Sequence, residues 1–184
     1  ANVAFVNAEG KGRGSVNFVL EPAPVQISYA GKYRGLRANG EGKYHKLLID
    51  SWQQSEEYKT ALAEFEQTGN KRDALNDGPE REALNKKYWE LYYVTPNLRL
   101  EVLNAIAISN EDPLASSLAI QFGALKSSNQ AVARLNELEK ILGPQQGLVN
   151  RRKAIQEVIL RRLNSELMKK NNQNLAVSAK SIDG

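Results

Sequence analysis

The stretch 110–144 most constrains how this chain can fold, because it carries the signals of two consecutive helices joined by a short turn. Asp112 can cap a helix whose first turn holds Pro113, where the missing amide hydrogen costs nothing. Polar residues 127–129 separate this helix from a second one, which Gly143 stops. The stretch therefore predicts a helical hairpin. The apolar faces expected to form its core are Leu114, Leu118, Phe122 and Leu125 in the first helix, and Ala131, Leu135, Leu138 and Leu142 in the second.

The sequence before the hairpin changes from a strand pattern to a helix pattern near residue 35. Short apolar and alternating runs in residues 1–34 predict about three antiparallel strands, with a bend at Pro22 and Pro24. Such a thin β unit is expected either to lean on the helices or to be truncated at its front. The fold class predicted is α+β, mainly helical, with a short N-terminal antiparallel β unit followed by a helical layer of about five helices. The predicted domains are 1–34 as the β region, 35–168 as the helical region packed with it as one domain, and 169–184 as a tail or linker.

Helix signals divide the helical region into segments. A first helix is expected over residues 44–67, with Thr68, Gly69 and Asn70 as its stop. A glycine-rich turn is expected much earlier, at residues 9–14. The remaining boundaries expected are a helix start at Pro79 with Asp77 or Gly78 as cap, a break at Pro96, and a last helix from Val149 to Met168.

Composition removes some classes of chemistry. The chain has no cysteine, which excludes disulfides, thiolate metal sites and thiol catalysis within it. No apolar run approaches the roughly 20 residues of a membrane-spanning helix, so no membrane span is expected. Because the sequence begins at Ala1 and its only methionine is Met168, we expect a processed mature protein or an excised piece of a longer one.

The positive charge of the chain is concentrated at its two ends. Residues 143–184 hold eight basic and three acidic residues within a total net charge of +4, which raises the question of nucleic-acid binding. On a helix, however, Arg152 and Arg161 would lie on opposite sides, so the cations ring the helix and form no single stripe. The pattern favours a solvated helix end, and no nucleic-acid partner is predicted.

Aromatic residues supply the candidate contact site. Trp89 and Tyr93 lie four residues apart on one side of a predicted helix, and flat rings of this kind can stack on a sugar, a nucleobase or a protein partner. The pattern favours core packing for both rings, and they remain the candidate ligand or partner contacts. His45 has no second histidine and no carboxylate at ligand spacing, so a surface position is expected.

No motif for catalysis or cofactor binding is present. The segment GKGRGS lacks the spacing of a phosphate-binding loop and precedes a strand. The acidic pairs Glu56 with Glu57, and Glu64 with Glu66, point in different directions on a helix and are expected to face solvent. We predict no enzyme activity, no catalytic residue, no metal and no cofactor. A hydrolase-like site assembled from distant acidic residues stays open as an alternative.

Three stretches, taken in order, resemble one family. They are FVLEPAPVQIS at 18–28, GLRANGEGKYHKLL at 35–48, and NEDPLASSLAIQF at 110–122 with LNELEKILGP after it. Together they are similar to the N-terminal accessory domain of Bacteroidetes-type envelope thioredoxin-like thiol-disulfide oxidoreductases, over about residues 15–165. The family usually has more β sequence at its front, a glycine where Ala23 stands, and asparagine where Asp112 stands.

The resemblance implies a function for a piece of such a protein. The catalytic thioredoxin domain with its CxxC motif is absent, and residues 175–184 stand where the linker to that domain would begin. The implied function is a non-catalytic accessory or interaction domain that docks a redox module or its substrate protein, in the periplasm or outer cell envelope. The alternative is a glycan-binding module of the envelope that uses Trp89 and Tyr93.

Overall fold

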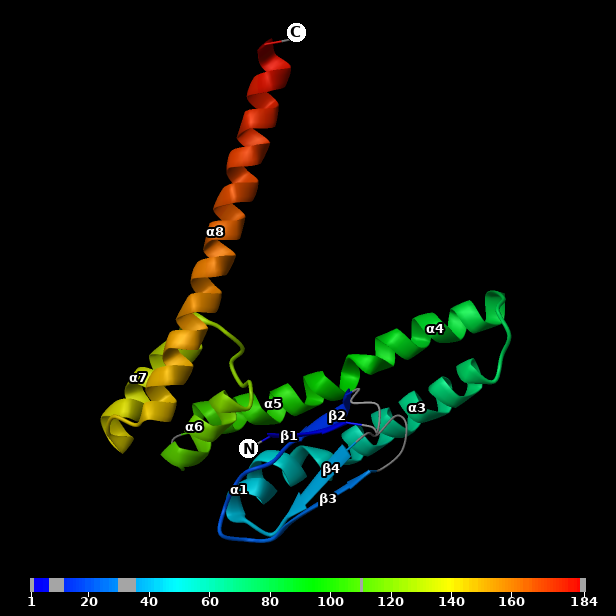
Figure 1. Cartoon of the computed structure of the whole chain (residues 1–184), viewed down its shortest axis with the longest axis vertical. Coiled ribbons are helices and arrows are strands. Elements are labelled where there is room, and N and C mark those ends of the chain that lie inside the picture. The colour runs from blue at the N-terminus through cyan, green and yellow to red at the C-terminus, as the bar shows by residue number, and fades with distance from the viewer. Residues whose placement is uncertain (1, 7–11, 30–35, 110, 183–184) are drawn as a thin grey trace. The chain divides into compact units, whose positions relative to one another are not determined.

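The computed structural model describes residues 2–6, 12–29, 36–109 and 111–182, and shows an α+β fold that is mainly helical (Figure 1). The predicted fold class is confirmed. The chain divides into two compact units, residues 1–105 and 106–184, which we describe separately. Among the described residues, no helix has the length and apolar character needed to cross a membrane.

Two antiparallel strand pairs form the β part of the first unit. β1 (Asn2–Val6) pairs with β2 (Gly12–Asn17), and β3 (Val25–Tyr29) pairs with β4 (Leu36–Gly40). The prediction of about three strands missed β4, because its sequence LRANG lacks the alternation of a half-buried strand. The glycine-rich turn predicted at 9–14 is wrong for residues 12–14, which belong to β2, and the rest of it lies outside the described residues.

The helix predicted over residues 44–67 is in fact interrupted. It begins as α1 (Lys43–His45), continues through one π-helical turn, η1 (Lys46–Asp50), and α2 (Ser51–Gln53), and restarts as α3 (Glu56–Asp73). The restart occurs because Ser55 adopts an extended backbone and its hydroxyl accepts a hydrogen bond from the Tyr58 amide at 3.2 Å. The stop predicted at Thr68 is also wrong. Thr68 and the following glycine are buried, and tertiary packing overrides the weak helix propensity of glycine.

α4 (Pro79–Tyr92) packs along α3 as an antiparallel hairpin, and α5 (Val94–Ile108) follows it (Figure 1). The predicted start at Pro79 with Gly78 as cap is confirmed. The break predicted at Pro96 falls slightly earlier, at Tyr93, and Pro96 occupies the first turn of α5, where a proline is tolerated. Lys87 bridges to Glu64 of α3 at 2.6 Å and ties the two helices together.

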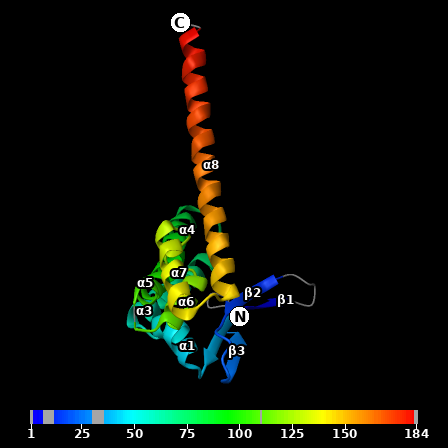
Figure 2. The same ribbon diagram turned by 90° about the vertical axis from the view of Figure 1, so that its left-hand side faces the viewer.

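The second unit contains the predicted hairpin. α6 (Pro113–Gln121) and α7 (Asn129–Leu142) begin with side-chain caps, from Asp112 to the Ala115 amide at 3.0 Å and from Ser128 to the Ala131 amide at 3.3 Å. Gly143, with φ at 77°, ends α7 as predicted. α6 packs on α7, and α7 packs on the first part of α8 (Gln146–Ile182), as both ribbon views show (Figures 1 and 2).

The face of α6 predicted to be core is wrong in detail. The side chains of Leu114, Leu118, Phe122 and Leu125 are only half-buried. The α6 residues that are buried are small or β-branched: Ala115, Ser116, Ser117, Ala119 and Ile120. Small side chains let neighbouring backbone approach closely, so they can occupy the tightest part of the interface. In α7 the prediction holds for Ala131, Leu135 and Leu138, which are fully buried, and Leu142 is half-buried.

α8 extends further than its sequence suggested. The helix continues through residues 169–182, which were predicted to be a tail or linker. Leu148 and Ile155 of α8 are buried, whereas every residue from 160 to 171 is exposed. The first part of α8 therefore contributes to the core of the second unit, and its middle part is solvated.

Candidate functional site

The clearest candidate site is a group of aromatic rings on the α3–α4 hairpin, which we call the aromatic face. Its members are Tyr88, Trp89, Tyr92 and Tyr93 at the end of α4, with Phe65 of α3 below them. The rings contact one another edge-on in sequence order, with centroid separations of 5.5, 5.4 and 5.3 Å. Phe65 stacks on Tyr88 at 4.6 Å. These contacts hold the rings in a defined arrangement, since each edge-on pair has a preferred geometry.

The outer rings of the aromatic face are open to solvent. Trp89, Tyr92 and Tyr93 are 49%, 47% and 60% exposed. Every residue of α4 is described, and none of them is buried. The core-packing interpretation of Trp89 and Tyr93 is therefore wrong. Helical spacing shows which residues share a side of a helix, but it does not show whether another element covers that side.

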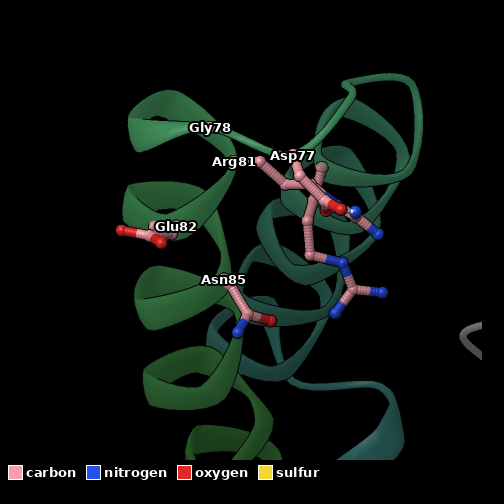
Figure 3. Close-up of a pocket in the computed structure, with 6 residues that line it drawn as sticks. Asp77, Gly78, Arg81, Glu82 and Asn85 are labelled. Carbon is pink, nitrogen blue, oxygen red and sulfur yellow. Dashed lines mark hydrogen bonds and ion pairs between the residues drawn. The ribbon is translucent and has the colours of Figure 1, made fainter.

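A polar pocket of about 290 Å³ lies at the start of α4, whereas the aromatic face lies at its end (Figure 3). Arg81 forms an ion pair with Asp77, and Glu82 points away from this pair (Figure 3). Arg72 pairs with the neighbouring Asp73 at 2.8 Å, and its guanidinium lies 3.8 Å from the ring centroid of Tyr88. Arg72 thus connects the pocket to the aromatic face. The pocket is lined by Arg72, Asp77, Gly78, Arg81, Glu82 and Asn85.

A third feature of the hairpin is a shallow apolar hollow between α3 and α4. It measures about 640 Å³, and its walls come from Ala74, Leu75, Ala83 and Leu84 with lysines and a glutamate at the rim. The sequence did not predict the polar pocket or the apolar hollow, because each is formed by residues of both α3 and α4. The hairpin therefore combines exposed rings, a polar pocket and an apolar hollow on one pair of helices.

His45 is not a surface residue, contrary to the prediction. Its side chain is fully buried, and its Nε2 donates to the Ala38 carbonyl oxygen at 3.2 Å. The ring packs so closely on Gly40 that an added Cβ there would lie 2.5 Å from it. The Asp50 carboxylate lies 3.6 Å from Nε2. Burial raises the pKa of Asp50, while the charges of His45 and Lys46 lower it.

Glu21 explains why the chain turns into a helix at this point. Its carboxylate accepts hydrogen bonds from the amides of Tyr44 at 3.1 Å and His45 at 2.8 Å. Glu21 thereby caps the start of α1 from a distant part of the sequence, and a Cβ at Gly42 would collide with it. Two of the stretches that carry the family resemblance meet here. The arrangement is architectural, because the His45 ring has no access to solvent.

The other side chains considered from the sequence are spread over the surface. Glu56 pairs with Lys59, and Glu64 pairs with Lys87, so these acids do not converge on one point. Arg152 is bound to Glu139 of α7, whereas Arg161 is 81% exposed. Within the described part of the chain, no cluster of three or more histidine or acidic residues could hold a metal ion.

Comparison with protein-family models, with curated proteins and with solved structures found no match to this chain.

Proposed function

We propose that this chain is a non-catalytic interaction domain that binds a partner protein through the aromatic face. The observation that carries the proposal is the exposure of Trp89, Tyr92 and Tyr93 in rings that already contact one another. Preformed rings lose little conformational freedom on binding, which lowers the entropic cost of association. Trp and Tyr are also the residues that most often dominate the binding energy of protein interfaces.

The charge around the rings agrees with a partner that is not strongly charged. Residues 79–93 hold three basic and three acidic side chains. Two of the three cations are paired within the hairpin, Lys87 with Glu64 and Arg81 with Asp77. A neutral rim around exposed rings suits an interface with an apolar centre and a polar edge.

The family resemblance supports a thioredoxin-like redox module, or its substrate protein, as the partner. The chain has no cysteine, so any thiol chemistry belongs to the partner. A cell-envelope location rests on the same resemblance. In this proposal the chain positions the redox module and takes no part in its electron transfer.

The two tryptophans of the chain allow a sharp test. The probe is a purified CxxC-containing thioredoxin-like domain from a bacterial envelope oxidoreductase, added to the ¹⁵N-labelled chain. The indole N–H signal of Trp89 should shift. The signal of Trp52 should not, because its indole already donates to the Leu48 carbonyl oxygen at 2.9 Å.

Matched variants complete the test. The double variant Trp89→Ala with Tyr93→Ala should weaken binding at least about tenfold. Tyr29→Ala is the control, because Tyr29 is 66% exposed on β3, outside the aromatic face. Equal losses in both variants, or no shift of the Trp89 signal at saturating probe, would show that this surface does not bind the redox module.

The second candidate function is glycan binding, and the polar pocket beside the rings favours it. Sugars are bound by an aromatic ring against one face together with polar groups at the hydroxyls. Asn85 lies in the pocket one helical turn before Trp89. A β-1,4-linked N-acetylglucosamine trimer should then shift the side-chain amide signals of Asn85, and Asn85→Ala should weaken glycan binding without affecting the protein partner. An unchanged spectrum with millimolar trimer removes this candidate.

A further inference from the structure

A second polar pocket lies between β4, the π-helical turn η1 and the start of α3. It measures about 340 Å³, within the size range of about 300–1,000 Å³ typical of small-molecule sites. None of its residues belongs to the aromatic face. The pocket is lined by Arg37 and Asn39 of β4, Asp50 of η1, Gln53 and Gln54 around the end of α2, and Lys59 and Leu62 of α3.

The lining offers more positive than negative charge. Arg37 presents the fork geometry that matches a carboxylate or a phosphate. Lys59 lies at the rim and pairs with Glu56 at 2.8 Å, with its side chain about half exposed. Among the described residues, Asp50 is the only acidic group that lines the pocket, and its partial burial disfavours the ionised form. The pocket therefore favours an anionic ligand.

Three side-chain amides add hydrogen-bonding capacity. Asn39, Gln53 and Gln54 each carry one acceptor oxygen and a donor NH₂ group. Among the described residues, none hydrogen-bonds to these amide side chains, so they can bind a ligand. A ligand that meets them all needs hydroxyl or amide groups in addition to its negative charge.

The π-helical turn η1 contributes Asp50 to the lining of the pocket. A π-helical turn holds one residue more than an α-helical turn, and such turns are frequently found at functional sites. The extra residue rotates everything after it by about 100° relative to an uninterrupted α-helix. Asp50 ends η1 and lines the pocket, while its other side faces the buried ring of His45.

We propose that this pocket binds a small hydroxylated organic anion, a sugar acid or a sugar phosphate. Its anionic oxygens lie between Arg37 and Lys59, and its hydroxyls face Asn39, Gln53 and Gln54. The site does not depend on the aromatic face or on the proposed protein partner.

Three probes of similar size test the proposal by NMR titration of the whole chain. D-glucuronate carries a carboxylate, glucose 1-phosphate carries a phosphate, and D-glucose is neutral. Both anions, or one of them, should shift the side-chain signals of Asn39, Gln53 and Gln54, and the anion that binds identifies the class. Equal shifts with glucose, or none with either anion, would overturn the proposal.

Charge variants separate a built site from general electrostatic attraction. Arg37→Gln and Lys59→Gln should each weaken anion binding about tenfold, while Arg161→Gln on α8 should leave it unchanged. Two independent variants keep the test valid if one of them fails to fold, which thermal unfolding checks. If Arg161→Gln weakens binding as much as Arg37→Gln does, the attraction is non-specific and the proposal is wrong.

The pH dependence of binding tests the role of Asp50, because a purely structural role of Asp50 would not make binding depend on its ionisation. Burial raises the pKa of Asp50, and raising the pH through that pKa ionises the carboxyl and repels the ligand, so glucuronate should bind less tightly at neutral pH than at a pH where Asp50 is protonated. Asp50→Asn should bind several-fold tighter near pH 7 and should flatten the pH profile. Among the described residues, the other charged groups around Asp50 are His45, Lys46, Arg37 and Lys59. Glu21 is bound to the Tyr44 and His45 amides, and Glu56 is paired with Lys59. An unchanged pH profile in Asp50→Asn would contradict the placement of the ligand beside Asp50.

Discussion

Two of the described helical hairpins, α3–α4 and α6–α7, each contain one helix that starts with a first-turn proline, yet these two helices differ in how many of their residues are buried. α6 starts at Pro113, after Asp112 caps it with its side chain, and α4 starts at Pro79, after Gly78, which has no side chain to cap with, so the two helices share a first-turn proline. The α6 helix has five buried residues among its nine. The α4 helix has fourteen residues and buries none of them. The residues at its start therefore locate a helix, but packing against neighbouring elements determines which of its side chains are buried.

The difference also divides the roles of the two hairpins. In α6–α7, buried small residues and a buried leucine row bring helices close together, and the buried Ser116 hydroxyl bonds to the Ile106 and Ser109 carbonyl oxygens. In α3–α4, the large rings stack on each other and stay open to solvent. We expect substitutions in the first hairpin to change stability and substitutions in the second to change binding.

Leu135→Ala should give the largest effect of the comparison. Leu135 is fully buried, and its removal leaves a cavity, so the free energy of unfolding should fall by about 2–5 kcal/mol. Leu118→Ala should cost less, because Leu118 is only half-buried. Urea denaturation of the whole chain measures both. Equal midpoints for Leu135→Ala and the parent chain would place the core elsewhere.

Arg134→Gln compared with Arg81→Gln should show the next effect. Arg134 donates to the Ala107 carbonyl oxygen at 3.0 Å and to the Ser109 carbonyl oxygen at 2.7 Å, with its side chain 11% exposed. These bonds satisfy carbonyls at the end of a helix, and their loss should cost about 1.5–3 kcal/mol. Arg81 is 41% exposed and pairs with an almost fully exposed Asp77.

Arg81→Gln should therefore change the free energy of unfolding by about 0.5 kcal/mol or less. Guanidinium denaturation cannot resolve such ion pairs well, because the denaturant screens them, so urea is the appropriate denaturant. If Arg81→Gln lowers the free energy of unfolding more than Arg134→Gln does, the assignment of stability to α6–α7 and of binding to α3–α4 is wrong.

The sequence predicted the positions of most helices but not which of their residues are buried. Asp112, Ser128 and Gly143 are local signals, and the structure places a cap or a stop at each of them. The burial of His45 could not be read from the helix pattern, because its ring packs against Gly40 and bonds to the Ala38 carbonyl oxygen of β4, a strand that the sequence did not predict. β4 was missed for a similar reason, since its pairing with β3 gives Ala38 a buried position that the alternation pattern does not mark.

The candidate site was predicted only in part. The spacing of Trp89 and Tyr93 marked one side of a helix, and both residues belong to the aromatic face. Phe65 and Arg72 reach that face from α3, and a pairing between two helices leaves no fixed spacing in the sequence. The sequence therefore indicated the α4 half of the site and missed the half that α3 supplies.

Trp89→Ala combined with Tyr93→Ala should lower stability much less than Leu135→Ala does. Both rings are about half exposed or more, so the variant loses ring contacts but leaves no buried cavity. The free energy of unfolding should fall by about 1 to 2 kcal/mol, because three ring pairs at the surface are lost and each contributes roughly 0.5 kcal/mol there. The same variant is expected to lose partner binding. A loss of stability as large as that of Leu135→Ala would mean that the rings are packed in solution, and the α3–α4 hairpin would then be a second core instead of a recognition surface.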